Sequence, residues 1–197
     1  MCGRYAIALK DAPPELARAM EALKPGDGRG NIKTGGEVFP SDRVAALANS
    51  RQGRPRIFPM AWGYSLEGGK RIINARWETA ADKPLFQDGM RRRRCLIPAS
   101  CYFEWEKGRV GRVKYAIGPR EGGLMYMAGI YRLERRGEAL VPAFAVLTRE
   151  AAPQLAFIHH RMPVVLSPQS AGDWLDIGRP AEQVLVQARL DLEFWPA

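Results

Sequence analysis

Cysteine is the second residue of the chain, in Met1-Cys2-Gly3-Arg4-Tyr5. Because the cysteine side chain is small, we expect Met1 to be removed, which would leave a thiol and an α-amine on one carbon. Ordinary pKa values of about 8 for the amine and about 8.5 for the thiol make both nucleophiles accessible at cellular pH. Such a 1,2-aminothiol attacks an aldehyde through nitrogen to give an imine, and then through sulfur to close a thiazolidine. A buried strand cysteine is the alternative, so other residues must decide.

Asn74 lies in a segment that could orient a substrate, Asn74-Ala75-Arg76-Trp77. Its amide offers one acceptor and two donors, which suit an amine or a sugar hydroxyl. Arg76 lies two residues on, and Trp77 could stack on a base. The alternative is an ordinary loop at a helix start, with Asn74 as the cap.

Glu104 is a candidate for proton transfer. It lies in the strand-like run 98–106 (PASCYFEWE), where alternation places Glu104 on one face and its neighbours Phe103 and Trp105 on the other. A carboxylate between two aromatic residues suits general acid–base work. The alternative is an exposed strand glutamate.

The two histidines of the chain are adjacent, His159 and His160, and Arg161 follows them. An imidazole exchanges protons near neutral pH, and with Cys2 it would also permit a thiolate–imidazolium pair. A surface histidine pair is the alternative.

Positive charge points to a polyanionic partner. The formal net charge is +9, and only seven of the 30 basic residues are lysines. Guanidinium groups suit phosphate binding and base stacking, and the run Arg91–Arg94 could form a phosphate track. An arginine-rich proteome or a solvated charged face would give the same composition.

Short apolar runs separated by glycine turns must position these residues. We predict a strand over 2–9, a helix around Leu16–Leu23, and a polar loop over 26–37. Further helices are expected near 84–91, 150–157, 168–175 and 180–188. Further strands are expected at 44–47, 56–62, 95–97, 101–105, 114–117, 124–133 and 140–147. The last three of these are joined by short turns, which favours antiparallel pairing. The sequence therefore predicts an α+β fold, one domain over residues 1–197, with a mainly antiparallel, barrel-like sheet flanked by short helices.

Composition excludes several classes of protein. No run of 18 apolar residues occurs, so we expect no membrane span. Charged residues from Arg4 to Asp11 interrupt any signal-peptide core. Three cysteines, an odd number, favour reduced thiols in the cytoplasm. Neither the cysteines nor the histidines have metal-ligand spacing, so we expect no metal and no cofactor.

Together these segments resemble the SOS response-associated peptidase (SRAP) domain family, the abasic-site processing proteins. The resemblance covers residues 2 to about 166, in the family's order. The matching motifs are Met1-Cys2-Gly3-Arg4, Pro40, Trp62-Gly63, Asn74-Ala75-Arg76 with Glu78, Arg93-Arg94-Cys95-Leu96-Ile97-Pro98, Glu104-Trp105, Ala128-Gly129-Ile130-Tyr131, and Ile158-His159 with Arg161-Met162-Pro163.

The resemblance implies a protein that binds single-stranded DNA and crosslinks covalently to abasic sites. By its motifs the catalytic residues would be Cys2, Asn74, Glu104 and His159. It also implies that Arg76 contacts phosphate, that Arg4 and Pro40 lie along the DNA groove, and that Trp62 stacks on a base near the lesion. Trp77, Arg94 and Arg161 are further candidates for DNA contact. Cys101 departs from the glycine of many members, and either adds a thiol near Glu104 or simply packs.

The implied reaction is a thiazolidine between the N-terminal Cys2 and the ring-opened abasic sugar, which shields the lesion during repair. A monomer would suffice. Two alternatives stay open: a thiol peptidase that uses Cys2 and His159, acting on its own initiator peptide, and a non-catalytic single-strand binding module.

Overall fold

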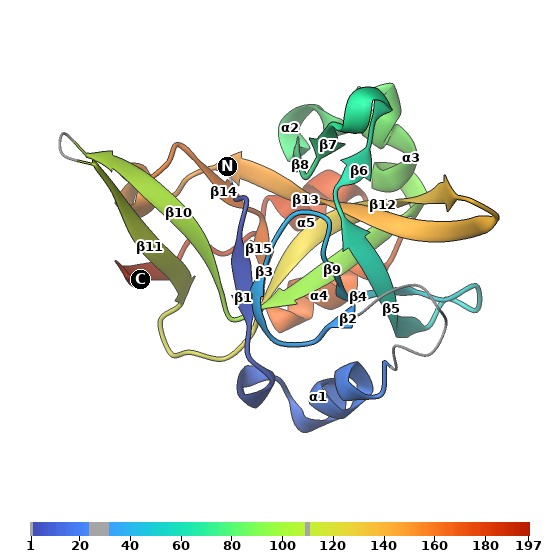
Figure 1. Ribbon diagram of the computed structural model, residues 1–197, viewed down its shortest axis with the longest axis horizontal. Coiled ribbons are helices and arrows are strands. Elements are labelled where there is room, and N and C mark those ends of the chain that lie inside the picture. The colour runs from blue at the N-terminus through green and yellow to red at the C-terminus, as the bar shows by residue number, and fades with distance from the viewer. Residues whose placement is uncertain (1, 24–31, 109–110) are drawn as a thin grey trace.

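Alternating apolar runs make strands the commonest regular element in the computed structural model, which describes residues 2–23, 32–108 and 111–197 (Figure 1). One sheet has five strands in the order β16-β11-β10-β1-β3. All of its pairings are antiparallel. Its strands are β1 (Tyr5–Ile7), β3 (Gly36–Val38), β10 (Cys101–Gly108), β11 (Gly111–Pro119) and β16 (Leu192–Pro196).

The second sheet closes on itself, because β12 pairs with both β9 and β13. The ring runs β13-β5-β4-β9-β12, and only its β13–β5 pairing is parallel. This barrel confirms the predicted α+β class with a mainly antiparallel, barrel-like sheet. Its strands are β4 (Arg43–Asn49), β5 (Pro55–Trp62), β9 (Arg94–Ala99), β12 (Met125–Arg136) and β13 (Ala139–Glu150).

Alternate residues of the barrel strands belong to two apolar clusters. In β13, Phe144 and Val146 join the cluster that includes Tyr5 and Tyr102 of the five-stranded sheet. Ala145 and its alternate neighbours join the cluster that includes the helices. The period-two pattern of a strand therefore packs one side against the first sheet and the other against the helices.

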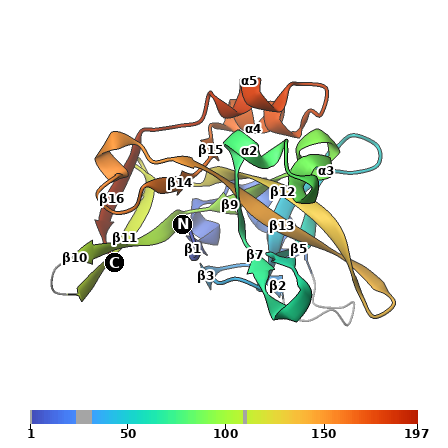
Figure 2. The same cartoon turned by 90° about the horizontal axis from the view of Figure 1, so that it is seen from above.

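Short helices cover the second side of the barrel, and Figure 2 shows α4 and α5 stacked along it. Ser167 caps α4 by accepting a hydrogen bond from the Ser170 amide at 3.2 Å. Trp174 on the same helix donates to the carbonyl of Cys95 at 3.0 Å, which anchors α4 on β9. These helices are α2 (Trp77–Ala80), α3 (Pro84–Arg92), α4 (Pro168–Leu175) and α5 (Ala181–Leu185). The remaining helix, α1 (Pro14–Glu21), instead packs in the first cluster through Met20.

Minor elements complete the described chain. Three are single-turn helices of the tighter 3-10 type: η1 (Leu9–Asp11), η2 (Glu67–Gly69) and η3 (Pro153–Leu155). Six are short strands: β2 (Ile32–Lys33), β6 (Tyr64–Ser65), β7 (Arg71–Ile72), β8 (Asn74–Arg76), β14 (Arg161–Pro163) and β15 (Val165–Leu166). Of these, β8 and β14 matter most, because both pair with β13; β8 carries Asn74, and β14 begins two residues after His159.

Three local predictions were wrong. The helix expected at 150–157 is only the turn η3, because the chain must return within ten residues to pair β14 with the end of β13. The loop expected at 26–37 contains β2 and most of β3, while residues 24–31 lie outside the described residues. The strands β11 and β12 do not pair, because the turn between them carries the chain from one sheet to the other.

Across the residues that the structure describes, every helix is too short or too polar to cross a membrane.

Candidate active site

The backbone of Cys2 is fixed by Asn74, although 71 residues separate them in the chain. Asn74 is the first residue of β8, which runs parallel to β13 with Asn74 opposite Val146. Its Nδ2 donates a hydrogen bond of 2.8 Å to the carbonyl oxygen of Cys2. Asn74 therefore does not cap α2, which begins at Trp77 without a side-chain cap. The Oδ1 atom of the same amide is buried and has no hydrogen-bond partner among the described residues.

The thiol of Cys2 is fully buried, with 0% of the residue exposed. Its Sγ donates a weak hydrogen bond of 3.6 Å to the carbonyl of Arg4. Burial raises the pKa of this thiol far above its ordinary value, and the nearby carboxylate of Glu104 raises it further. The sulfur is therefore held as a neutral thiol in the folded protein.

Glu104 lies beside Cys2 because β10 pairs with the N-terminal segment. The amide of Phe103 donates to the carbonyl of Arg4 at 2.8 Å, and Tyr5 pairs with Tyr102. Glu104 is only 5% exposed, so its carboxylate is inside the site and not on a solvated strand face. The predicted strand alternation thus places the carboxylate where it acts electrostatically on the Cys2 thiol.

His159 follows η3 and has a defined ring orientation. Its Nδ1 accepts a hydrogen bond of 2.9 Å from the amide of Arg161, so the neutral ring carries its proton on Nε2. The ring stacks on His160 with centroids 4.4 Å apart. Burial lowers the pKa of His159 below its ordinary value, and the charge of Glu104 partly offsets this. A neutral imidazole can accept a proton at neutral pH.

The four residues predicted to be catalytic are therefore brought together from four parts of the chain. A direct hydrogen bond joins Asn74 to Cys2. The charge of Glu104 affects both the Cys2 thiol and the His159 imidazole, so both groups lie within electrostatic range of Glu104. The arrangement combines a buried thiol, a carboxylate, an imidazole and an amide oxygen that has no hydrogen-bond partner among the described residues.

Cys101 lies beside this cluster, and its charge is a minor cause of the raised pKa of the Cys2 thiol. It lies opposite Ala6 in the β1–β10 pairing and is half-buried. Because three positions separate it from Glu104, the two side chains point to opposite faces of β10. Its half-burial agrees with packing, and its effect on Cys2 agrees with a second thiol near the site.

Arg76, Arg4 and Pro40 keep surface that a strand of DNA could reach. Arg76 is exposed, and the other two are half-buried. The Arg4 guanidinium lies 3.2 Å from the Glu37 carboxylate and over the ring of Phe39, at 4.5 Å from its centroid. Phe39 was not anticipated from the sequence, yet it is 39% exposed. Its position directly before Pro40 was the available signal.

Trp62 cannot stack on a base, which corrects the expectation from the sequence. It is 0% exposed. Its ring stacks on Phe144 inside the first cluster, with an interplanar angle of 1°, and its Nε1 donates to the carbonyl of Ile73 at 3.1 Å. As the last residue of β5, it follows the strand's alternation into the interior. Its role is to support the residue before Asn74.

Arg94 and Arg161 are also poor candidates for a DNA surface. Arg94 is 6% exposed and donates to three backbone carbonyls, so it is not part of a solvated arginine track. The Arg161 side chain is 10% exposed and forms a two-pronged ion pair with Glu78, at 2.7 and 2.8 Å. It also donates to the Thr148 carbonyl at 2.6 Å. Trp77 is half-buried against the helical cluster.

No group of three potential metal ligands occurs within residues 2–23, 32–108 and 111–197.

The fold and the cluster around Cys2 define an α+β protein with a cysteine-centred site. A model of the family described as SOS response associated peptidase (SRAP) matches residues 1–196. The chain belongs to this family.

Relatives agree with this assignment. The abasic site processing protein YedK of Escherichia coli (strain K12) is 34% identical over 189 residues, which cover 89% of this chain and 79% of YedK. The abasic site processing protein YoaM of Bacillus subtilis (strain 168) is 29% identical over 187 residues, with the same two coverages.

Solved structures share the fold. A protein from Bacteroides thetaiotaomicron superposes with a TM-score of 0.80 at 18% identity, covering 99% of this chain and 91% of that chain. A protein from Bordetella bronchiseptica gives 0.77 at 19% identity, covering 100% and 99%. At these identities the structures support the fold alone.

Proposed function

We propose that this protein processes abasic sites in single-stranded DNA by forming a thiazolidine crosslink through Cys2. The observation that carries the proposal is the hydrogen bond from Asn74 to the Cys2 carbonyl, beside Glu104 and His159. The names of the relatives support the same substrate, since YedK and YoaM are both called abasic site processing proteins. The proposal requires that Met1 is removed, so that the α-amine of Cys2 is free.

The first step is opening of the abasic sugar. The sugar is mostly a closed hemiacetal, and proton transfer is needed to release the aldehyde; Glu104 supplies it. The Cys2 amine then attacks the aldehyde carbon, forming a C–N bond, and one water leaves to give the imine. Glu104 and His159 move the protons in this condensation. The open Oδ1 of Asn74 holds the amine or a sugar hydroxyl in an attack geometry.

The second step closes the ring through sulfur. The S–H of Cys2 adds across the imine: a C–S bond forms at the carbon, and the proton passes to the nitrogen. No oxidant or reductant is needed, so the adduct has the mass of protein plus DNA minus one water. Protonation of the ring by Glu104 would reverse the crosslink, and elimination of phosphate from the imine would give weak lyase activity.

The state of the Cys2 thiol favours attack by the amine first. A thiol peptidase needs a thiolate, which is usually generated by a lowered pKa or a paired imidazolium. Here burial raises the pKa of the thiol and lowers that of His159, so the pair is neutral. Both pKa shifts disfavour a thiolate–imidazolium pair. Neither shift prevents the neutral thiol from adding to an imine that has already formed beside it.

Single-stranded DNA would approach across the exposed Arg76, with Arg4, Phe39 and Pro40 along the same groove. The net charge of +9 supports attraction of the phosphate backbone. One chain supplies all four residues of the site, so the proposed reaction needs no second copy and no cofactor.

The test compares abasic and intact single strands incubated with protein whose processed N-terminus has been verified by intact mass. The proposal predicts a denaturation-resistant adduct with abasic DNA only, lighter by one water than the sum of the reactants. Cys2→Ala should form no stable adduct. Cys101→Ala is the matched control, because it removes a cysteine that the proposed reaction does not use, and it should react normally. Cys2→Ser also keeps the α-amine but lacks the sulfur. Its imine with abasic DNA should therefore be trapped by cyanoborohydride, and no stable adduct should remain when the reductant is left out.

The same experiment separates the alternatives. A binding module would retain both strands alike and form no adduct, and a peptidase would cleave peptides whether or not abasic DNA is present. Protein that retains Met1 should be inactive. If Cys2→Ala crosslinks as well as the unmodified sequence, the thiazolidine mechanism is wrong.

A further inference from the structure

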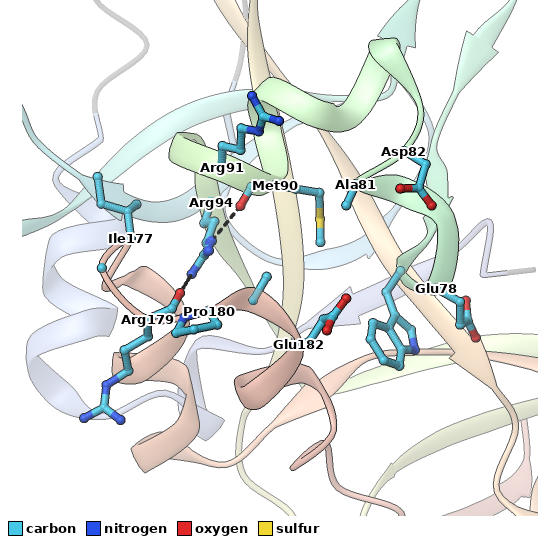
Figure 3. Close-up of a pocket in the computed structure, with 13 residues that line it drawn as sticks. Glu78, Ala81, Asp82, Met90, Arg91, Arg94, Ile177, Arg179, Pro180 and Glu182 are labelled. Carbon is cyan, nitrogen blue, oxygen red and sulfur yellow. Dashed lines mark hydrogen bonds between the residues drawn. The ribbon is translucent and has the colours of Figure 1, made fainter.

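A cavity of about 430 Å³ lies between α2, α3 and the segment that leads into α5 (Figure 3). None of the four residues around Cys2 lines it. Arginine side chains border one end, and carboxylates border the other, with Met90 and small residues between them (Figure 3). Its volume is within the range of about 300–1,000 Å³ that is typical of small-molecule sites.

Arg94 is the group that marks this cavity as an anion site. Its Nε donates to the Met90 carbonyl at 2.9 Å, and its Nη1 donates to the carbonyls of Asp176 and Arg179 at 3.2 and 2.9 Å. These partners are neutral, and in the described part of the chain no carboxylate lies within ion-pair distance of the guanidinium. Nη2 has no hydrogen bond to any described residue.

A buried cation with no carboxylate at ion-pair distance is costly, even when carbonyl groups solvate it. Arg94 is 6% exposed, and desolvation lowers its pKa, an effect that the more distant charge of the exposed Asp176 offsets only in part. Three carbonyls hold the guanidinium in one orientation, so it can receive an anion without reorganising. Arg91 lines the same end of the cavity from an exposed position on α3.

The opposite end has the complementary chemistry. The half-buried indole of Trp77 lines it, together with the carboxylates of Asp82 and Glu182. Neither carboxylate forms an ion pair with a described residue. Glu78, in contrast, is already paired with Arg161. This end can therefore stack a planar ring and accept hydrogen bonds from its amino group.

We propose that this cavity binds a nucleoside 5′-phosphate, with the phosphate on Arg94 and Arg91 and the base on Trp77. Glu182 accepts a hydrogen bond from an exocyclic amine or a sugar hydroxyl. The same chemistry is presented by a free nucleotide and by the 5′-phosphorylated end of a strand. The site goes beyond the crosslinking function and does not depend on it.

The test is a titration of the protein with adenosine 5′-monophosphate, in which binding is measured by calorimetry and by tryptophan fluorescence. We expect one-to-one binding, at least tenfold tighter than that of adenosine or of inorganic phosphate alone. Arg91→Gln, Trp77→Leu and Glu182→Gln should each weaken it at least fivefold, and they avoid the buried Arg94, whose replacement could prevent folding. Arg92→Gln is the matched control, because Arg92 neighbours Arg91 on α3 and is also exposed, but does not line the cavity and is paired with Asp88.

The outcomes are distinct. Absence of saturable binding, or binding that none of the three variants weakens, overturns the proposal. Tighter binding of a 5′-phosphorylated tetranucleotide than of the monophosphate identifies a strand end as the natural source, and the reverse order identifies a free nucleotide. Cys2→Ala protein should bind the nucleotide unchanged, so failure of the crosslinking function would not be mistaken for failure of this site.

Discussion

Replacing Asn74 by alanine should slow crosslinking without weakening DNA binding. The substitution removes the 2.8 Å hydrogen bond to the Cys2 carbonyl. A lost neutral hydrogen bond accounts for about 1 kcal/mol, and a carbonyl left unsatisfied in a partly buried site for about 1 kcal/mol more. If Cys2 must be held in this position in the transition state, about 2 kcal/mol corresponds to a rate about 30-fold lower. Affinity for an intact strand should change less than threefold, because Asn74 does not carry charge.

The assay is single-turnover crosslinking of abasic single-stranded DNA, with adduct quantified on denaturing gels and affinity measured separately by anisotropy. Asn49→Ala is a closely matched control. Asn49 also donates from Nδ2 to a carbonyl at 2.8 Å, that of Leu175, and its Oδ1 is likewise buried without a partner among the described residues. Asn49→Ala should therefore destabilise the fold by a similar amount and leave the rate intact. Equal slowing by both variants, or no slowing by Asn74→Ala, would refute the assigned role.

Three further predictions concern charge. Glu104→Gln should slow crosslinking or its reversal while affinity for DNA stays within threefold, whereas Glu106→Gln, two residues along the same strand, should leave the rates unchanged; parallel loss of rate and affinity would make Glu104 structural. Because burial lowers the pKa of His159 below its ordinary 6.5, the unfolded chain binds the proton more readily, so stability present above pH 6.5 is lost as the pH falls below it. Lowering the pH from 7.5 to 5 should therefore reduce the free energy of unfolding, measured by chemical denaturation, more in the unsubstituted protein than in His159→Gln. An equal reduction in both would contradict this cause. Finally, Arg76→Gln should reduce the slope of log K against log salt concentration for single-strand binding by about 0.7. Arg161→Gln should mainly lower the free energy of unfolding, by about 1–3 kcal/mol. A slope that changes in Arg161→Gln and not in Arg76→Gln would contradict these two roles.

Much of the architecture could be predicted from local pattern. The alternation of apolar residues identified the barrel strands and the glycine turns between them, because strand periodicity is written into neighbouring residues. Wrong expectations arose where tertiary pairing overrides local preference. The segment after β13 has helix-forming residues, yet it forms only η3, because His159 and β14 must be returned to the edge of β13.

Residue type alone could indicate which groups carry the chemistry, but not which of them solvent reaches. Trp62 and Phe39 are both aromatic residues close to matching motifs. The end of β5 directs Trp62 into the barrel, whereas Phe39 follows β3 and stays 39% exposed. Such a difference depends on where each strand ends relative to its neighbours, and that register is set by pairings with residues far along the chain.

The difference between buried and exposed side chains also decides which arginines could bind DNA. A net charge of +9 attracts DNA whichever residues carry it, but a specific phosphate contact needs a guanidinium that is free of other partners. Arg161 is committed to Glu78 and Arg94 to backbone carbonyls. Arg76 alone among these three is exposed, and it lies two residues from Asn74, which holds Cys2. In the reaction proposed above, a phosphate bound by Arg76 would hold the adjoining sugar near Asn74 and Cys2, so we propose that Arg76 couples DNA binding to the reaction.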